Sequence, residues 1–268
     1  LSGMKGVSDN AVASIVEARQ KEGPFNSIFN MLKRIDLRAA NRKTLENLAL
    51  GGAFDSFENE HRAMYFYQNG EDKTFLERAV KYAQTLTAQE ESSQQSLFGG
   101  SAEVSLPEPE LPTVQTWPRM LLLGKEKEVN GMYISSHPLD DFKYEIEYLC
   151  THELRALNDL TKLNEFTVAG IITTAKHLTS RQGKPFGIFT IEDYSDSFEF
   201  RLFGEDYLKF KPFLESNIML YIKGFVNRYT PKWEGAQERI DAKIRSVALL
   251  QDVLNTSSQG LKLTLPLP

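Results

Sequence analysis

Cysteine is almost missing from this sequence, and long apolar runs are missing altogether. The 268 residues include one cysteine, Cys150, which excludes an internal disulfide framework and fits a reducing, cytoplasmic compartment. No apolar run approaches the roughly 18 residues that a membrane-spanning helix needs, so we expect no membrane partner. The sequence opens on Leu1 rather than Met and has no signal peptide pattern, so we expect a fragment of a longer protein.

The common motifs of catalytic and nucleotide-binding sites are also missing. There is no G-x-x-x-x-G-K-[ST], G-x-G-x-x-G or H-E-x-x-H pattern, and the four histidines are scattered along the chain. Carboxylate pairs such as Asp140-Asp141 lie in charged stretches, where a solvated helix face explains them. We therefore expect no catalytic residue, metal site or cofactor within this chain.

Charge is unevenly spread along a chain whose formal net charge is −5. Lys and Arg outnumber Asp and Glu in residues 1–50, whereas acids outnumber bases in residues 61–164. A basic end on an acidic protein indicates an anionic partner at that end. Ordinary solvated helix faces would give the same pattern.

Periodicity divides the chain into five segments. Residues 1–86 predict a domain of short helices, with N-caps at Ser8 or Asp9, at Asn26 or Ser27 and at Asn41, and with a break near Asn69-Gly70. Apolar residues at helical spacing should be buried in the first two helices: Val12, Ile15, Val16, Ile28, Phe29, Leu32 and Ile35. Residues 87–116 read as a flexible linker and residues 117–164 as a helical connector, with one helix over 117–136.

A period of two begins near Glu165 and yields five candidate strands with a short helix between the third and fourth. That order predicts a five-stranded OB-type barrel over residues 165–250, although another five-stranded sheet is the open alternative. Residues 251–268 would start a truncated C-terminal domain. The fold class is thus α+β and multidomain, with a helix-hairpin-helix domain before the barrel.

Strand alternation sorts the barrel residues by face. The expected inward set is Phe198, Phe200, Leu202, Ile218, Leu220, Ile222, Val226, Ile240, Ala242 and Ile244. The expected outward set is Arg201, Phe203, Met219, Tyr221, Lys223, Phe225, Lys243 and Arg245. The second strand is ambiguous, because Ile188 and Phe189 are both apolar.

The stretch "MKGVSDNAV" places Gly6 and Val7 just before a helix N-terminus, where backbone N–H groups and the helix dipole suit a DNA phosphate. A helix-hairpin-helix turn usually has glycine where this chain has Ser8, and an ordinary helix–helix turn remains an equal alternative. The expected duplex-DNA set is Lys5, Gly6, Val7, Ser8, Arg42 and Lys43.

Cations mixed with aromatic residues on the barrel predict a groove for single-stranded DNA. The expected set comes from strands and from the loops after the first and fourth strands: Arg181, Lys184, Arg201, Tyr221, Lys223, Phe225, Arg228, Tyr229, Lys232, Trp233 and Lys243. Nearby acids leave the domain close to neutral, so we expect weak binding. An incidental charged surface is the alternative.

Four long blocks of the sequence resemble the C-terminal half of the alpha subunit of bacterial DNA polymerase III. They are "LSGMKGVSDNAVASIVEAR", "GPFNSIFNMLKRIDLRAANRKTLENLALGGAFDSF", "LLGKEKEVNGMYISSHPLDDF" and "FTVAGIITTAKHLTSRQGKPFGIFTIEDYSDSFEFRLFGEDY". The resemblance implies a duplex-binding helical region, an OB domain for single-stranded template, and a clamp-binding motif between them. "QQSLF" in "ESSQQSLFGG" matches that motif, with Gln94 as its polar position and Leu97 and Phe98 as its apolar pair.

The resemblance also implies partners and an activity for the whole protein. The parent would be a DNA-directed DNA polymerase that uses Mg²⁺, yet its palm domain with the metal-binding aspartates has no counterpart in this sequence. The expected partners are DNA, the sliding clamp and, through the missing C-terminal domain, a clamp-loader subunit. The alternative is an accessory region that presents DNA to the active site of a nuclease or ligase.

Overall fold

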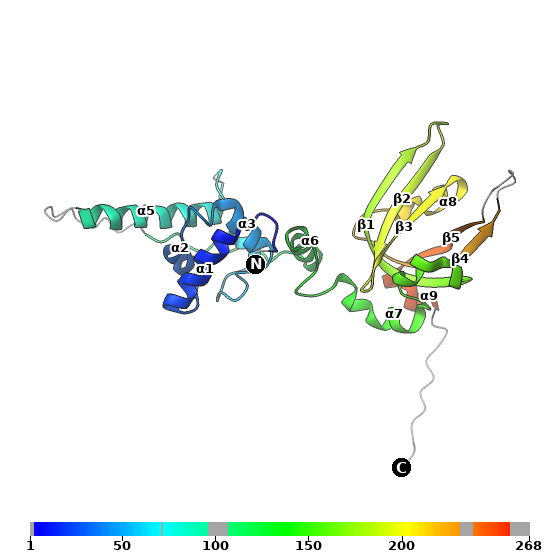
Figure 1. Cartoon of the computed structure of the whole chain (residues 1–268), viewed down its shortest axis with the longest axis horizontal. Coiled ribbons are helices and arrows are strands. Elements are labelled where there is room, and N and C mark those ends of the chain that lie inside the picture. Colours follow the sequence, from blue (N-terminus) through cyan, green and yellow to red (C-terminus); the bar gives the residue numbers. More distant parts are fainter. Residues whose placement is uncertain (1–2, 71, 96–106, 231–237, 258–268) are drawn as a thin grey trace, which may run out of the picture. The chain divides into compact units, whose positions relative to one another are not determined.

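The computed structural model describes residues 3–70, 72–95, 107–230 and 238–257. The chain forms two compact units, Leu1–Ser136 and His137–Pro268. Unit 1 consists of helices, and unit 2 is built on a five-stranded antiparallel sheet (Figure 1). This confirms the predicted fold class. No helix in the described ranges is long and apolar enough to cross a membrane.

Unit 1 begins with three short helices whose starts are fixed by side-chain caps. The hydroxyls of Ser8 and Ser27 and the amide oxygen of Asn41 each accept a backbone N–H three residues ahead, as the sequence predicts. The helices of this unit are α1 (Asp9–Glu22), α2 (Ile28–Arg34), α3 (Arg42–Leu50), α4 (Arg62–Tyr65), α5 (Phe75–Gln95) and α6 (Arg119–Asn130). Such short helices are stable only when they pack on one another.

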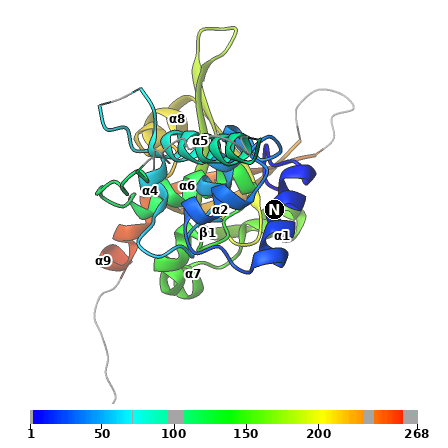
Figure 2. The ribbon, with the colours of Figure 1, turned by 90° about the vertical axis from the view of Figure 1, so that its left-hand side faces the viewer.

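The core of unit 1 contains the expected stripe of α2, because Ile28, Phe29, Leu32 and Ile35 are all buried. Helix α2 packs against α5, and the two lie side by side in Figure 2. In α1 the buried residues are Ala11, Ile15 and Ala18, whereas the expected Val12 and Val16 are only partly buried. Ile15 is buried as predicted, but the small residues Ala11 and Ala18 complete the contact face of α1 in place of the two valines.

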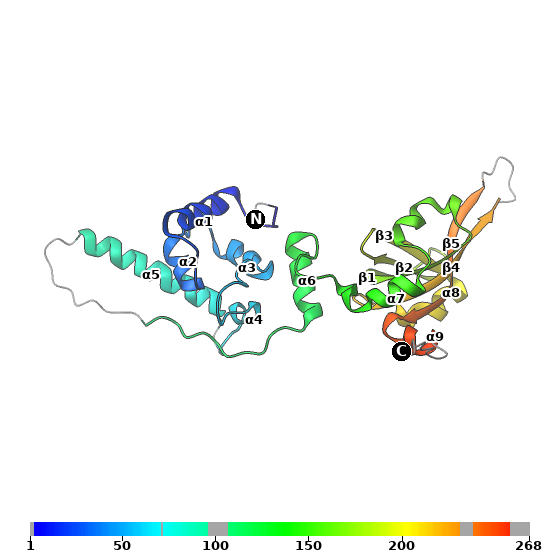
Figure 3. The same ribbon diagram turned by 90° about the horizontal axis from the view of Figure 1, so that it is seen from below.

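Helix α5 shows that the prediction of a flexible linker is wrong for its first residues. The break near Asn69-Gly70 is confirmed, but α5 then continues nine residues into segment 87–116, as far as Gln95. A capping box starts this helix: Thr74 N–H donates to Glu77, and Glu77 N–H donates to the Thr74 hydroxyl. Residues 87–95 contain neither Gly nor Pro, so nothing in the sequence stops the helix there. Figure 3 shows α5 extending beyond the other helices of unit 1.

Helix α6 closes unit 1. It ends at Gly131, whose φ of 77° is left-handed, so the helix expected over 117–136 is shorter than predicted. Buried Glu126 lies 3.6 Å from buried Arg62, and it also accepts hydrogen bonds from Ser135. The contact with Arg62 holds α6 against α4, and the bonds from Ser135 hold the segment after α6 against this helix.

Unit 2 starts with a 3₁₀ turn (Pro138–Phe142), α7 (Lys143–Leu149) and a second 3₁₀ segment, η2 (Leu154–Lys162). The strands follow as β1 (Glu165–Thr179), β2 (Pro185–Glu192), β3 (Ser197–Phe203), β4 (Met219–Tyr229) and β5 (Arg239–Leu249). Helix α8 (Gly204–Phe210) lies between β3 and β4, as predicted, and α9 (Val253–Ser257) follows β5. The sheet order is β3-β2-β1-β4-β5, with all pairs antiparallel.

The barrel core follows the predicted alternation. Phe200, Leu202, Leu220, Ile222 and Val226 are buried inside, and Phe198, Ile240 and Ala242 pack partly against them. Long strand β1 pairs with β4 through its first half and with β2 through its second half, which bends the sheet into a barrel. The β1–β2 hairpin projects beyond the other strands (Figures 1 and 2).

Candidate nucleic-acid interfaces

The turn before α1 has a backbone shape that favours glycine. Gly6 has a φ of +70°, and the Val7 N–H donates to Met4 O at 3.2 Å. The Val7 N–H is therefore already bonded to Met4 O, and the Val7 side chain is buried in the core. Val7 cannot donate its N–H to a phosphate, although the sequence predicted that it would. Within the described residues the N–H groups of Gly6 and Ser8 have no acceptor, and they precede the positive end of α1.

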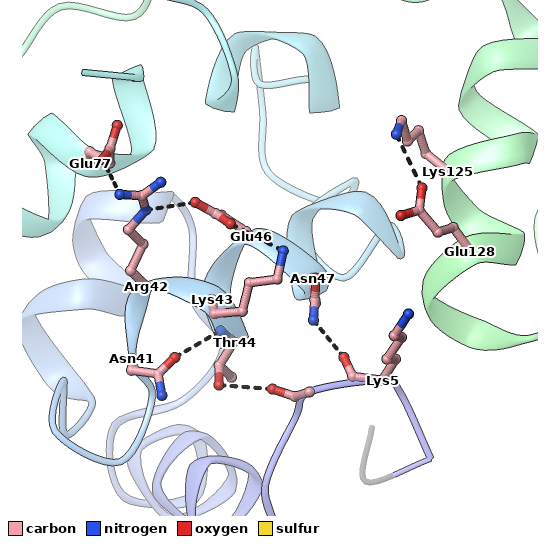
Figure 4. Close-up of polar contacts among 11 residues, drawn as sticks. Lys5, Asn41, Arg42, Lys43, Thr44, Glu46, Asn47, Glu77, Lys125 and Glu128 are labelled. Atoms are coloured by element: carbon pink, nitrogen blue, oxygen red, sulfur yellow. Dashed lines mark hydrogen bonds and ion pairs between the residues drawn. The ribbon is translucent and has the colours of Figure 1, made fainter. Parts of the chain in front are cut away.

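Two side chains of α3 hold this turn in place (Figure 4). The Thr44 hydroxyl donates to Gly6 O at 3.1 Å, and the Asn47 amide donates to Lys5 O at 2.6 Å. Both side chains are nearly inaccessible to solvent. A methyl group on Gly6 would lie 2.6 Å from Asn47 Nδ2, which is too close. The Lys5 N–H donates to Val129 O, so α6 provides a third anchor.

The expected cations of α3 are exposed but paired. Arg42 Nε lies 2.7 Å from Glu46 Oε1, Lys43 Nζ lies 3.5 Å from Glu46 Oε2, and Arg42 also pairs with Glu77 (Figure 4). The hydrogen bond and charge of Glu46 raise the pKa of Arg42. Any phosphate that bound Arg42 or Lys43 would therefore compete with Glu46.

In unit 2, Arg181 and Lys184 lie in the turn of the projecting β1–β2 hairpin. The turn is closed by Ser180 N–H to Lys184 O, at 2.8 Å, and by Gly183 at a φ of +76°. Both cations are exposed, and neither has an acid within ion-pair distance in the part of the chain that the structure describes. The hairpin therefore presents two unneutralised positive charges.

Cross-strand pairing places two rows of side chains on the outer face of β1, β2 and β3. One row is Leu178, Phe186 and Phe203, and the next row is Lys176, Ile188 and Arg201. The rings of Phe186 and Phe203 stack at 5.4 Å with an interplanar angle of 18°. Phe203 is 56% exposed and Leu178 40% exposed, which is unusual for residues of this size. We call these six residues the outer face.

Sequence reasoning included only Arg201 of this outer face in the expected site. The other residues were missed because the sequence did not reveal the register of the second strand. The tight connection at Asp193–Asp196 sets Phe189 opposite Phe200, both buried, and this forces Phe186 and Ile188 outward. Asp193 explains the connection: its carboxylate accepts the N–H groups of Ser195, Asp196 and Leu154.

A groove with a volume of about 450 Å³ lies between β3 and β5 and brings together three expected residues. Arg201, Tyr229 and Lys243 line it, together with Phe203 and Arg239, which were not in the expected set. Arg201 is held by Glu199, with Nη2 and Oε1 2.8 Å apart. We call this cavity the β3–β5 groove.

Other expected residues do not join this groove. Tyr221 was expected to face solvent, but it is buried under the cluster of Leu139, Leu250 and Val253, and its hydroxyl donates to Leu149 O. Arg228 bonds to Asn164 and to the carbonyls of Thr161 and Leu163, so its guanidinium joins β4 to the end of η2.

Lys223 and Phe225 lie on the outer side of β4 and do not line the β3–β5 groove. Lys243, opposite Phe225 in the register, is the member of that side that also lines the groove. Four further expected residues lie outside the part of the chain that the structure describes: Leu97, Phe98, Lys232 and Trp233. Gln94 is described only as part of the α5 backbone. Within the described ranges, no group of three or more His, Cys, Asp or Glu residues could hold a metal ion.

Two sequence families match this chain. Residues 1–64 match the helix-hairpin-helix motif family, and residues 166–243 match the OB-fold nucleic acid binding domain family. Among solved structures, the mitochondrial single-stranded DNA-binding protein Rim1 of S. cerevisiae covers 33% of this chain and 97% of its own, at 12% identity. Its TM-score of 0.25 is too low to carry an argument.

Longer matches are with curated bacterial proteins. The DNA polymerase III subunit alpha of Escherichia coli K12 is 31% identical over 233 residues, which is 85% of this chain and 19% of that protein. The subunit from Pseudomonas fluorescens is 27% identical over 279 residues, which is 99% of this chain and 23% of that protein. The chain therefore spans about a fifth of the length of these relatives. Because the matches run through both units, this chain is homologous to part of the bacterial DNA polymerase III alpha subunits.

Proposed function

We propose that this chain is a DNA-binding and clamp-binding region of a replicative DNA polymerase III alpha subunit. The outer face of the barrel carries the proposal: half-buried Phe186 and exposed Phe203 stack beside the cations Lys176 and Arg201. Aromatic rings bind unpaired bases whatever their identity, and neighbouring cations neutralise the phosphates. The homologous subunits supply the biological context.

Unit 2 would bind single-stranded template. Bases would stack on Phe186 and Phe203, while Arg181 and Lys184 of the β1–β2 hairpin would contact the backbone on one side. The hairpin extends the surface beyond the barrel, so one strand could follow the hairpin onto the outer face (Figure 1).

Unit 1 would bind duplex DNA through its backbone. The N–H groups of Gly6 and Ser8 and the positive end of α1 suit one phosphate, and Lys5, Arg42 and Lys43 add positive charge. None of these groups reads a base edge, so binding would be independent of sequence and would weaken steeply with salt.

The C-terminal end of α5 and the residues after it would dock on the sliding clamp through Gln94, Leu97 and Phe98. The double change Leu97→Ala/Phe98→Ala should remove most of the affinity, because each buried apolar side chain contributes roughly 1.5–3 kcal/mol. Ser96→Ala, between Gln94 and Leu97, is the matched control and should bind normally. Equal binding of clamp by the double variant and the unaltered chain, measured by calorimetry, would exclude this docking mode.

For the whole protein we propose DNA-directed DNA polymerase activity with Mg²⁺, and contact with a clamp-loader subunit through a further domain. The relatives' name supports this, and the chain matches 19–23% of their length.

The proposal is tested by fluorescence anisotropy with labelled duplex and labelled oligothymidine over a range of salt concentrations. Arg181→Glu/Lys184→Glu should weaken oligothymidine binding and lower its salt slope by about 0.7 for each phosphate that the variant no longer binds. Duplex binding should persist in that variant. The unaltered chain binding neither DNA at low salt would overturn the proposal.

A further inference from the structure

A hollow in the surface of unit 1 lies beside the C-terminal half of α1. Its volume is about 370 Å³. Buried side chains of α1, α2, α3 and the segment after α3 form its floor: Ile15, Met31, Leu48, Phe54 and Phe57. Exposed Arg19 and Ser56 lie at its rim, and none of the residues that line it belongs to the expected duplex-DNA set. We call this hollow the α1–α3 pocket.

The aromatic rings of the α1–α3 pocket are held in place by contacts within unit 1. Phe54 and Phe57 stack at 5.6 Å with an interplanar angle of 7°. The guanidinium carbon of Arg34 lies 4.4 Å from the ring centroid of Phe25, which also lines the pocket. The same guanidinium donates to Gly23 O at 2.7 Å, which fixes the chain between α1 and α2. The pocket is thus formed before any ligand arrives, and this lowers the entropic cost of binding.

A single cation marks the rim of the pocket. Among the described residues that line it, Arg19 is the only charged one. Its guanidinium has no ion pair in the described chain, and Glu22, three residues further along α1, pairs with Arg34 instead, with Nε and Oε2 3.1 Å apart. Lys21, in the same last turn of α1, also has no ion pair in that part of the chain. An unpaired cation beside an apolar hollow matches a ligand that carries a carboxylate next to an apolar group.

Size and polarity narrow the class of this ligand. A volume of about 370 Å³ is near the lower end of the roughly 300–1,000 Å³ of ligand sites, so the pocket suits one large side chain better than a cofactor. Apart from Arg19 and Ser56, the side chains that line it are apolar, so a nucleic acid base would bury polar edges without partners. A phenylalanine side chain has no such edges, and its ring can pack against Phe54 and Phe57.

We propose that the α1–α3 pocket anchors a phenylalanine side chain of a partner protein, with a neighbouring carboxylate of that protein on Arg19. A ring in a preformed apolar pocket, with charged groups at the rim, is a common arrangement of anchor residues at protein interfaces. This docking uses neither the turn at Gly6 nor the cations of α3, so it is independent of the function proposed above.

Methyl NMR of the full chain tests the pocket. The chain has six methionines, and Met31 lines the pocket, so labelled methionine methyl groups give a signal at the site. Acetyl-Glu-Phe-Glu-amide at millimolar concentration should shift the Met31 signal and leave that of Met219, in unit 2, unchanged. Acetyl-Glu-Ala-Glu-amide lacks the ring and should bind about tenfold more weakly or worse. Acetyl-Gln-Phe-Gln-amide lacks the carboxylates and should bind about two- to fivefold more weakly.

Variants of the chain locate the contacts. Arg19→Gln should weaken binding of the acidic tripeptide about two- to fivefold and leave the neutral tripeptide unaffected. Arg38→Gln is the matched control, because Arg38 is exposed in the same unit and does not line the pocket. Ala53→Leu enlarges an exposed side chain of the lining and should abolish binding, while the methyl signals outside the pocket remain those of a folded chain. Ala13→Leu, on an exposed part of α1 outside the pocket, should bind normally.

Each remaining outcome would overturn the proposal. One is the absence of any Met31 shift with the acidic tripeptide. Another is an equal loss in Arg19→Gln and Arg38→Gln, which would show general electrostatics. Tighter binding of octanoate than of the tripeptide would indicate a small carboxylate ligand rather than a protein. Displacement of the tripeptide by oligothymidine or duplex DNA would indicate a nucleic acid site. Failure of DNA binding by the unaltered chain is measured separately by anisotropy and leaves this pocket untouched.

Discussion

The two units offer positive charge to DNA in different ways. In unit 1 the cations Arg42 and Lys43 are held by Glu46, and the turn at Gly6 offers backbone N–H groups. In unit 2 the cations Arg181 and Lys184 have no acid partner in the described chain and project from a hairpin. In unit 2 an exposed aromatic ring, Phe203, and its stacking partner Phe186 lie on the same surface as these cations.

This contrast follows from what each form of DNA exposes. Duplex DNA buries its bases and presents a regular phosphate backbone, which fixed N–H groups can match without flexible side chains. Single-stranded DNA exposes its bases, and stacking on rings contributes about 1–3 kcal/mol per base. The difference predicts that variants in one unit alter one kind of DNA binding and spare the other.

The largest effect should come from Phe186→Ala/Phe203→Ala. Loss of two stacking rings should weaken oligothymidine binding at least tenfold and leave duplex binding unchanged, as measured by anisotropy. The matched control is Tyr144→Ala/Tyr148→Ala, which removes an exposed ring pair, 4.6 Å apart, from α7 of the same unit. Equal losses in the two double variants, or parallel loss of duplex binding, would break the contrast between the units.

The next largest effect should come from Gly6→Ala in unit 1. The left-handed φ of Gly6 and the clash of an added methyl group with Asn47 would displace the turn. Duplex affinity should then fall about tenfold, which is the effect of losing one charge-assisted hydrogen bond. Gly70→Ala is the control, because Gly70 also has a positive φ but an added methyl group would meet no atom within 4 Å. Similar duplex affinities in the two variants would show that the turn does not contact phosphate.

A smaller effect, of opposite sign, should come from Glu46→Gln. Arg42 and Lys43 would lose their shared anion, so duplex binding should tighten by about two- to fivefold, while oligothymidine binding stays constant. Glu128→Gln, which breaks the exposed pair with Lys125 on α6, is the control for a change in net charge. Weaker duplex binding in Glu46→Gln would mean that Glu46 positions the two cations rather than competing for them.

Periodicity and capping residues predicted most of the fold, because those signals are local. Ser8, Ser27 and Asn41 start their helices as expected, and the order of five strands and one helix predicted the barrel. The error at α5 was also local: Ser and Gln indicated a linker, although no residue in 87–95 stops a helix.

The candidate site was harder to predict, because its geometry depends on pairings between distant residues. Alternation showed that Arg201 and Phe203 face outward, but only the register with β2 places Phe186 beside Phe203. Tyr221 follows the same alternation, and yet residues from the start and end of unit 2 cover it. The attachment of Asn47 to the Lys5 carbonyl joins residues 42 positions apart, which no local pattern reveals.

The smallest effect should come from Glu60→Gln, which should change only how the stability of unit 1 depends on pH. Glu60 is buried, and its carboxylate accepts the Ile28 N–H and the Tyr65 hydroxyl. Desolvation raises the pKa of Glu60 above its ordinary value. The hydrogen bonds from Tyr65 and Ile28 lower this pKa, but they only partly offset the desolvation. Because the folded state then holds this proton more tightly than the unfolded state, the stabilisation is complete below the unfolded pKa. It is lost as pH rises through the folded pKa.

Glu60→Gln should remove this pH dependence, since the neutral amide resembles the protonated acid and can keep both partners. Denaturant unfolding at a series of pH values should show that the unaltered unit 1 loses stability toward neutral pH relative to the variant. The unfolding of unit 2 should be the same in both proteins, because the contacts of Glu60 are within unit 1. An equal pH dependence in the two proteins would show that other groups control the stability of unit 1.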